Sequence, residues 1–235
     1  IDNMIKKVIF IFLFLSNVTA YSQKINVGLN LGTGISSQSL NSLDSKFTAG
    51  VKFNTIGGIP YRVDSYIGYN YGLMVEFYFN LPSSSIDDDI SYNKISLKSG
   101  LNYSSQGVEV EDGNKTRFRN NLTYLQIPIL INFKYKKFNI LLGPQIHLLN
   151  NFKSTEVRST SLSSSATTQS FVFEKGNYNE KDPNFVFGVG YELYEGLSLQ
   201  IKSLRSIRNI TNINGEEWKN KSFEITLNYI LNKLL

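Results

Sequence analysis

Residues 123–150, TYLQIPILINFKYKKFNILLGPQIHLLN, decide the fold because apolar and polar residues alternate through two consecutive runs. Successive side chains of a β-strand point to opposite faces, so each run predicts a strand with one apolar and one polar face. The tight turn at residues 134–137 predicts that the strands fold back on each other. The apolar faces hold Leu125, Ile127, Ile129, Ile131 and Phe133, then Phe138, Ile140, Leu142, Ile146 and Leu148.

The N-terminal region has the features of a secretory signal peptide. Lys6 and Lys7 precede an apolar run over residues 8–15, and small residues suited to cleavage follow it. The apolar run is shorter than the ~20 residues of a helix that spans a bilayer. We therefore expect residues 1–22 to be an N-terminal extension and signal peptide, cleaved near residues 20–22. Residues 23–235 are expected to form one outer-membrane β-barrel domain after export.

Eight alternating segments follow the signal peptide. Each has about 10 residues or slightly more, which is the length of a tilted membrane strand. An even number of strands closes an antiparallel barrel without a free edge, as lipid requires. The predicted fold is therefore an all-β, eight-stranded antiparallel transmembrane up-and-down β-barrel with its apolar faces toward lipid. Besides the two strands of the hairpin, the segments are residues 25–35, 66–80, 90–107, 184–194, 197–206 and 221–231.

The connections between these segments alternate in length. Those at residues 134–137 and 195–196 are tight, and residues 82–89 form a third, somewhat longer turn. Outer-membrane barrels have short periplasmic turns and longer external loops. The pattern thus predicts periplasmic termini and four external loops, at residues 36–65, 108–120, 151–183 and 207–220.

Five titratable side chains fall on the polar faces and are expected in the lumen. An eight-stranded barrel leaves room inside for side chains and little else. A network of paired groups that fills the lumen is therefore favoured over a lining that selects a solute. These residues are Glu76, Lys98, His147, Lys202 and Glu224.

The sequence indicates no catalytic, cofactor-binding or metal-binding residues. With no Cys and one His, a zinc site is disfavoured. Catalysis by His147 would need a nucleophile beside it, such as Ser99 or Ser105. Those two serines are expected to face lipid and His147 the lumen. The net charge of +5 is scattered, so nucleic-acid binding is not expected either.

The hairpin resembles the signature of the PorT-like outer-membrane β-barrel family of Bacteroidota. That family shows a Tyr-Leu-Glu-Ile-Pro strand and then a strand ending in Gly-Pro, and Gln126 here replaces the acidic residue. The resemblance implies an outer-membrane barrel; one branch of the family takes part in type IX secretion and gliding, and most members have no assigned activity. Because Pro donates no ladder hydrogen bond, a bulge is expected at Pro128. The matching residues are Tyr124, Leu125, Ile127, Pro128, Gly143 and Pro144.

These observations favour a small, monomeric, non-enzymatic outer-membrane barrel without cofactors. It would contact outer-membrane lipid and act through its external loops or periplasmic rim as a structural or interaction component, linked to protein secretion or gliding. Two alternatives stay open. One is an enzyme that modifies outer-membrane lipid, and the other is a lipocalin-like barrel that binds an apolar ligand and has its oily residues inside.

Overall fold

The computed structural model describes residues 22–42, 47–48, 51–52, 54–56, 59–79, 93–112, 117–158 and 174–231. The signal peptide predicted upstream falls outside these residues, apart from its last position. None of the helices described has the length and hydropathy to cross a membrane. The eight long strands are β1 (Ser22–Ser42), β5 (Ile59–Phe79), β6 (Asn93–Asp112), β7 (Arg117–Tyr135), β8 (Phe138–Arg158), β9 (Lys181–Tyr194), β10 (Leu197–Ser206) and β11 (Glu216–Ile230).

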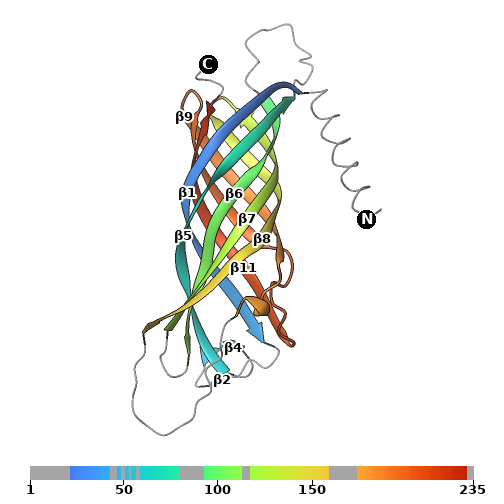
Figure 1. The fold of residues 1–235 in the computed structure, drawn as a ribbon. Helices are drawn as coiled ribbons and strands as arrows, with labels where there is room; N and C mark the ends of the chain where they lie inside the picture. The colour runs from blue at the N-terminus through green and yellow to red at the C-terminus, as the bar shows by residue number, and fades with distance from the viewer. Residues whose placement is uncertain are drawn as a thin grey trace, which may run out of the picture.

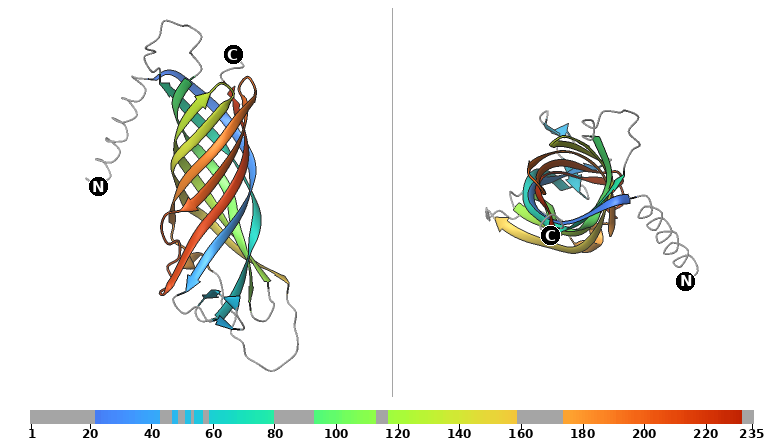
Figure 2. Two further views of the ribbon diagram at one scale, coloured as in Figure 1. Left: turned by 180° about the vertical axis from the view of Figure 1, so that it is seen from behind. Right: turned by 90° about the horizontal axis from the view of Figure 1, so that it is seen from above.

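These strands close into a barrel (Figures 1 and 2). Each long strand pairs antiparallel with the next one along the chain, and β1 pairs with both β5 and β11, which closes the sheet. The predicted eight-stranded antiparallel barrel is confirmed. Shorter elements accompany it: β2 (Phe47–Thr48), β3 (Val51–Lys52), β4 (Asn54–Ile56) and the 3-10 helix η2 (Lys175–Asn177).

The two faces of the barrel wall have the polarity that a membrane barrel needs. In β11, Phe223, Ile225 and Leu227 are 43–50% exposed, whereas the intervening Glu224 and Thr226 are each 2% exposed. The other strands repeat this alternation through the section that we call the belt, where apolar side chains cover the outer surface. The predicted outward direction of the apolar faces is confirmed. A lipocalin-like barrel requires the reverse arrangement, so the structure does not support that alternative.

Five strands and the first residues of β11 continue past the belt, into residues predicted as loops. β1, β5, β6, β7 and β8 each have 19 to 21 residues. At about 3.3 Å per residue, 21 residues span roughly 70 Å, about twice the length of a membrane strand. The loop predictions at residues 36–65, 108–120, 151–183 and 207–220 are thus wrong where strand is present. In β6 the alternation persists there with its polarity reversed, since Val108 and Val110 are buried. We call this section the extended end; it lies at the bottom of Figure 1.

At the extended end the barrel wall opens between β1 and β5, and β8 likewise continues past its last pair with β9, Leu148 with Lys181. β1 pairs with β5 only as far as Ser36 and Tyr66. Beyond that point β1 stays paired with β11 up to Ser42, while β5 stays paired with β6 back to Tyr61. The opposite end of the barrel carries the two-residue turns between β7 and β8 and between β9 and β10, and we call it the short-turn end.

Pro128 interrupts the sheet without the bulge predicted there. The β7–β8 ladder pairs Pro128 with Gln145 and Ile131 with Leu142, with no change of register between the two pairs. The shift in this region lies between Thr123 and Tyr124 instead. The missing donor of Pro128 is thus accommodated by a local break in the ladder, because a proline leaves one bond unmade but adds no residue.

The glycine of the hairpin's Gly-Pro pair is needed for a steric reason. Gly143 has φ 154° and lies against β7, where an added Cβ would come within 2.3 Å of the carbonyl oxygen of Ile129. A side chain therefore does not fit at this position, and glycine permits the close approach of the two strands. On the neighbouring side of β7, the Ser99 hydroxyl donates to the Pro128 carbonyl at 2.8 Å.

Candidate functional site

The lumen at the short-turn end is organised around the carboxylate of Glu76. One oxygen accepts from the Ser96 hydroxyl at 2.5 Å and the Asn132 amide at 2.6 Å, and the other accepts from the Tyr78 hydroxyl at 2.9 Å. These side chains come from β5, β6 and β7. Three donors thus hold one buried carboxylate, and none of them carries a charge.

The other three charged residues predicted in the lumen also point inward. The Lys98 ammonium donates to Gln200 at 3.0 Å and to Asn228 at 2.9 Å. Lys202 and Glu224 form an ion pair at 2.9 Å between register partners of β10 and β11. The structure therefore brings one predicted pair together, while Glu76 and Lys98 are held by neutral side chains.

Side chains fill much of the lumen. The cavity between Glu76, Lys98 and Gln200 has about 40 Å³ of space, and another beside Gln106 and Glu224 has about 10 Å³. A cavity needs roughly 10–15 Å³ to hold one water molecule, so these spaces suit one or a few waters. Inward-facing apolar residues add to the filling: Leu130, Leu141, Val186 and Leu204. This arrangement resembles a plugged barrel more than a channel.

His147 lies in the lumen, fully buried, beside a carboxylate that the sequence analysis missed. Its Nδ1 is 3.9 Å from Oδ2 of Asp182, its Nε2 is 2.8 Å from the Gln145 amide nitrogen, and its ring centroid is 5.2 Å from that of Tyr124. Asp182 stands in a segment predicted as an external loop. The signal that points to it is strand pairing, because His147 and Asp182 are register partners of β8 and β9.

The Asp182 carboxylate belongs to a hydrogen-bonded chain toward the extended end. The Asn220 amide donates to Asp182 at 2.8 Å and to the Tyr124 hydroxyl at 3.1 Å. The amide of Gln38 donates in turn to Asn220 at 2.9 Å, and Gln38 accepts from the Tyr178 hydroxyl at 3.5 Å. The chain joins β1, β7, β9 and β11 inside the barrel and fixes their side chains.

The two serines considered as nucleophiles do not approach His147. Ser99 donates to the Pro128 carbonyl, as described above. Ser105 is only 2% exposed, so the prediction that it faces lipid is wrong. The β5–β6 register shifts beside it, between Ser65 and Asn70, and its hydroxyl bonds the Asn121 side chain at 2.8 Å and lies 3.2 Å from the Tyr66 hydroxyl. The geometry thus gives His147 no activated hydroxyl from either serine.

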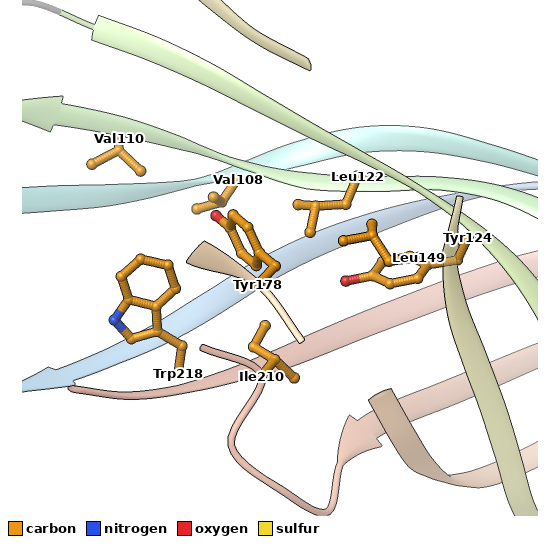
Figure 3. Packing of buried hydrophobic residues seen from close by; sticks show 8 residues of the cluster. All are labelled: Val108, Val110, Leu122, Tyr124, Leu149, Tyr178, Ile210 and Trp218. Atoms are coloured by element: carbon orange, nitrogen blue, oxygen red, sulfur yellow. The ribbon is translucent and has the colours of Figure 1, made fainter. Parts of the chain in front are cut away.

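An apolar cluster closes the interior of the extended end (Figure 3). Tyr178 and Ile210, from the β8–β9 and β10–β11 connections, meet side chains of the strands there. Tyr178 contacts Trp218 edge to face at 5.4 Å and Phe152 at 5.2 Å, and burial raises the pKa of the Tyr178 hydroxyl. The buried members are Val108, Val110, Leu122, Tyr124, Leu149, Tyr178, Ile210 and Trp218.

The connections that carry this cluster are bonded to each other and to β11. The backbone N–H of Asn179 donates to the backbone carbonyl of Ile210 at 2.8 Å. The backbone N–H of Ile210 donates in turn to the backbone carbonyl of Trp218 at 2.9 Å. These bonds pair backbone hydrogen-bond donors and acceptors of two irregular segments. The described parts of both connections, residues 174–180 and 207–215, are thereby held together as a cap over the cluster.

The outer surface of the extended end carries a group of ion pairs on β5, β6 and β7. The Arg117 guanidinium is 3.0 Å from Glu111, 3.6 Å from Glu109 and 3.7 Å from Asp64, and its hydrogen bond to Glu111 is the main factor that raises its pKa. Arg119 contacts Glu109 at 2.7 Å. Within the described part of the chain, no three His, Cys, Asp or Glu residues are grouped so as to hold a metal ion.

Comparison with known proteins identifies the class of this protein. The family model for the outer membrane protein beta-barrel domain matches residues 19–212. Among solved structures, the chain is similar to Ail, the attachment invasion locus protein of Yersinia pestis, with a TM-score of 0.41 and 9% identity over 89% of this chain and 100% of Ail. It is also similar to OprG from Pseudomonas aeruginosa, with a TM-score of 0.37 and 12% identity over 90% of this chain and 98% of OprG. No curated protein sequence matches it.

Proposed function

Because the chain belongs to the outer membrane protein beta-barrel domain family, we propose that it is a non-enzymatic barrel that works as a structural or interaction component through its extended end. The observation that carries the proposal is the continuation of the strands past the belt into a section with an apolar core of its own. A strand needs only about 9–11 residues to cross the membrane. The additional residues of β5 to β8 thus serve a purpose outside it.

Ordering those residues has an entropic cost of about 1–2 kcal/mol per residue for the backbone alone. The cluster around Tyr178 and Trp218 offsets this cost by burying apolar surface. The product is a packed platform with an outer surface of paired charges, including those of Arg117. Such a surface suits recognition of a protein partner, because charged groups contribute specificity at an interface.

The orientation of the platform follows from the lengths of the connections. Outer-membrane barrels place their short turns in the periplasm and their longer connections outside the cell. Under this rule the extended end faces the exterior, and the signal peptide proposed in residues 1–22 exports the chain.

A role without catalysis is supported by the surroundings of His147. The ring and Asp182 are both fully buried, at 0% exposure, behind the apolar cap. A lipid-modifying enzyme needs its catalytic groups at the lipid boundary, where substrate can reach them. The network around His147 is better explained as a means of fixing the strands of the lumen.

Participation in protein secretion or gliding rests on the PorT-like resemblance of the hairpin alone. In the structure, Pro128 and Gly143 shape the backbone of the belt, so these motif residues support the architecture of the barrel more directly than a partner. We include secretion or gliding in the proposal as the process in which the platform acts.

The proposal is tested by deleting the gene in the native host and measuring gliding and the secreted proteins. Complementation then compares the wild type with an Arg117→Glu/Glu111→Arg variant, which keeps a local pair and changes the charge pattern of the platform. We expect the wild type to restore the lost process and the swapped variant to restore it incompletely. Full restoration by the variant would argue against the charged platform as the working surface. An unaffected deletion strain would rule out the secretion or gliding role.

A further inference from the structure

An apolar groove of about 450 Å³ lies on the outer surface of the barrel at the short-turn end. Its walls come from three neighbouring strands. Ile95 of β6 pairs with Phe133 of β7, which pairs in turn with Ile140 of β8, and Tyr135 pairs with Phe138 beside them. The groove therefore lies between two rows of side chains that run across the strands.

The walls of this groove are among the exposed apolar residues of the belt. Phe133 is 44% exposed, Tyr135 56%, Phe138 64% and Ile140 49%. Phe138 also contacts Tyr191 of β9 edge to face at 4.9 Å, which fixes one wall. Aromatic residues at the end of a belt mark the boundary between hydrocarbon and headgroups. The groove thus opens to lipid at the depth where acyl chains meet their headgroups.

A cation stands at the rim of the groove. The Lys136 ammonium lies 5.5 Å from the ring centroid of Tyr135, one of the wall residues. Lys94 also borders the groove and is exposed. Lys134 of β7 forms an ion pair with Glu192 of β9 nearby. Positive charge is therefore placed at the rim of the apolar groove.

The backbone of Lys136 strengthens this observation. Its φ is 53°, in the left-handed region, and it is the one non-glycine residue with positive φ among those described. Gly, Asn and Asp adopt this conformation more readily than a long side chain does. Backbone strain at such a position points to a use for the side chain. Here the feature that distinguishes Lys from Gly or Asn is its charge beside the groove.

We propose that this groove binds an anionic phospholipid, with an acyl chain between Phe133 and Ile140 and the headgroup phosphate at Lys136. The hydrocarbon-facing wall suits an acyl chain, and lysines at the membrane surface attract anionic headgroups. The long Lys stem can follow the apolar wall while its ammonium stays at the interface. A soluble partner does not fit this position, since the groove lies within the belt that lipid covers. The site is independent of the external platform.

The test uses the full barrel in nanodiscs of phosphatidylcholine with a minor share of phosphatidylglycerol. Native mass spectrometry then counts the lipids that stay bound after release. The wild type is expected to retain phosphatidylglycerol in preference to phosphatidylcholine. Lys136→Asn removes the charge while Asn still accepts the turn conformation, and it should lower this preference by about fivefold. Lys153→Asn, at an exposed site of β8 toward the extended end, is the matched control and should change nothing.

A second variant tests the apolar groove itself. Ile140→Trp fills the groove and leaves Lys136 in place, and it should reduce the retention of both lipids. Heat-modifiable gel mobility checks that each variant is folded. Equal retention of the two lipids by the wild type, or an unchanged preference in Lys136→Asn, would overturn the proposed headgroup site. Unchanged retention in folded Ile140→Trp would overturn the acyl-chain position.

Discussion

The belt and the extended end share several strands, and in β6 the two faces of the strand exchange their polarity between them. In β6, the belt places Lys98 inside and Leu97 outside, while ten or so residues further on Val110 is fully buried inside and Glu109 lies on the outer surface. The alternation of a strand is unchanged between the two sections. What changes is the surrounding medium, because lipid favours an apolar exterior and water a polar one. The point where the polarity inverts thus marks where the barrel leaves the membrane.

The largest expected effect is on the apolar core that defines the extended end. Trp218→Ala should destabilise this section by about 3–5 kcal/mol, as truncation of a buried aromatic residue does. Hydrogen exchange at residues 216–222 and protease cleavage of the extended end should both rise. Leu227→Ala, on the lipid-facing side of the same strand, is the control and should leave them unchanged. If Trp218→Ala is as protected as the wild type, the cluster does not hold the extended end together.

The lumen of the belt offers the next test, since there the interior is polar. Lys202→Met leaves Glu224 buried without its cation and should cost about 3 kcal/mol, at the low end for a broken buried pair. Urea unfolding from lipid vesicles measures the change. The double variant Lys202→Met/Glu224→Leu should recover most of the loss, because it removes the unpaired charge. A double variant less stable than Lys202→Met would contradict this account.

The outer surfaces of the two sections can be compared with the same substitution. Ile225→Lys puts a charge on the lipid-facing side of the belt and should cost about 2–4 kcal/mol. Thr155→Lys makes the same change on an exposed site of the extended end and should have little effect. Unfolding in vesicles gives both values. Equal costs at the two positions would show that the polarity boundary is misplaced.

The smallest effect is expected for the ion pairs outside the extended end. Arg117→Gln removes a guanidinium that contacts three carboxylates but is partly exposed, so solvent screening weakens each pair. We expect no measurable change in the free energy of unfolding, at either low or high salt. A clear loss of stability that disappears in high salt would show that this group of charges supports the fold as well as covering its surface.

Much of the belt could be predicted from sequence because its pattern is simple. Residues such as Phe223 and Ile225 alternate with polar neighbours over about ten positions. The even number of such runs predicted a closed antiparallel barrel. The direction of the apolar face followed from the predicted signal peptide and the connection lengths. Each of these signals is found within a short stretch of sequence or by counting such stretches. Predicting the belt therefore needed no knowledge of side-chain packing.

The extended end escaped prediction because its outward residues are charged. Residues 108–120 were predicted as a loop, although Val108 and Val110 continue the strand alternation beside the outward Glu109 and Glu111. Asp182 escaped for a different reason: its contact with His147 follows from the pairing of β8 and β9, which begins inside a segment assigned to a loop. The position of Ser105 depended on a register shift in β5, and such shifts leave no clear mark in composition.

The closure of β1 onto β11 has a consequence for how the molecule assembles. Every other neighbour of a long strand is the next one along the chain, so those pairings grow as hairpins. The closing ladder instead joins residues on the order of 200 positions apart, such as Gly28 and Ile230. Non-local contacts are slow to form, since the entropy of loop closure is lost before the contacts compensate for it. We therefore expect the β1–β11 seam to form last, and its formation to limit the rate at which the barrel matures.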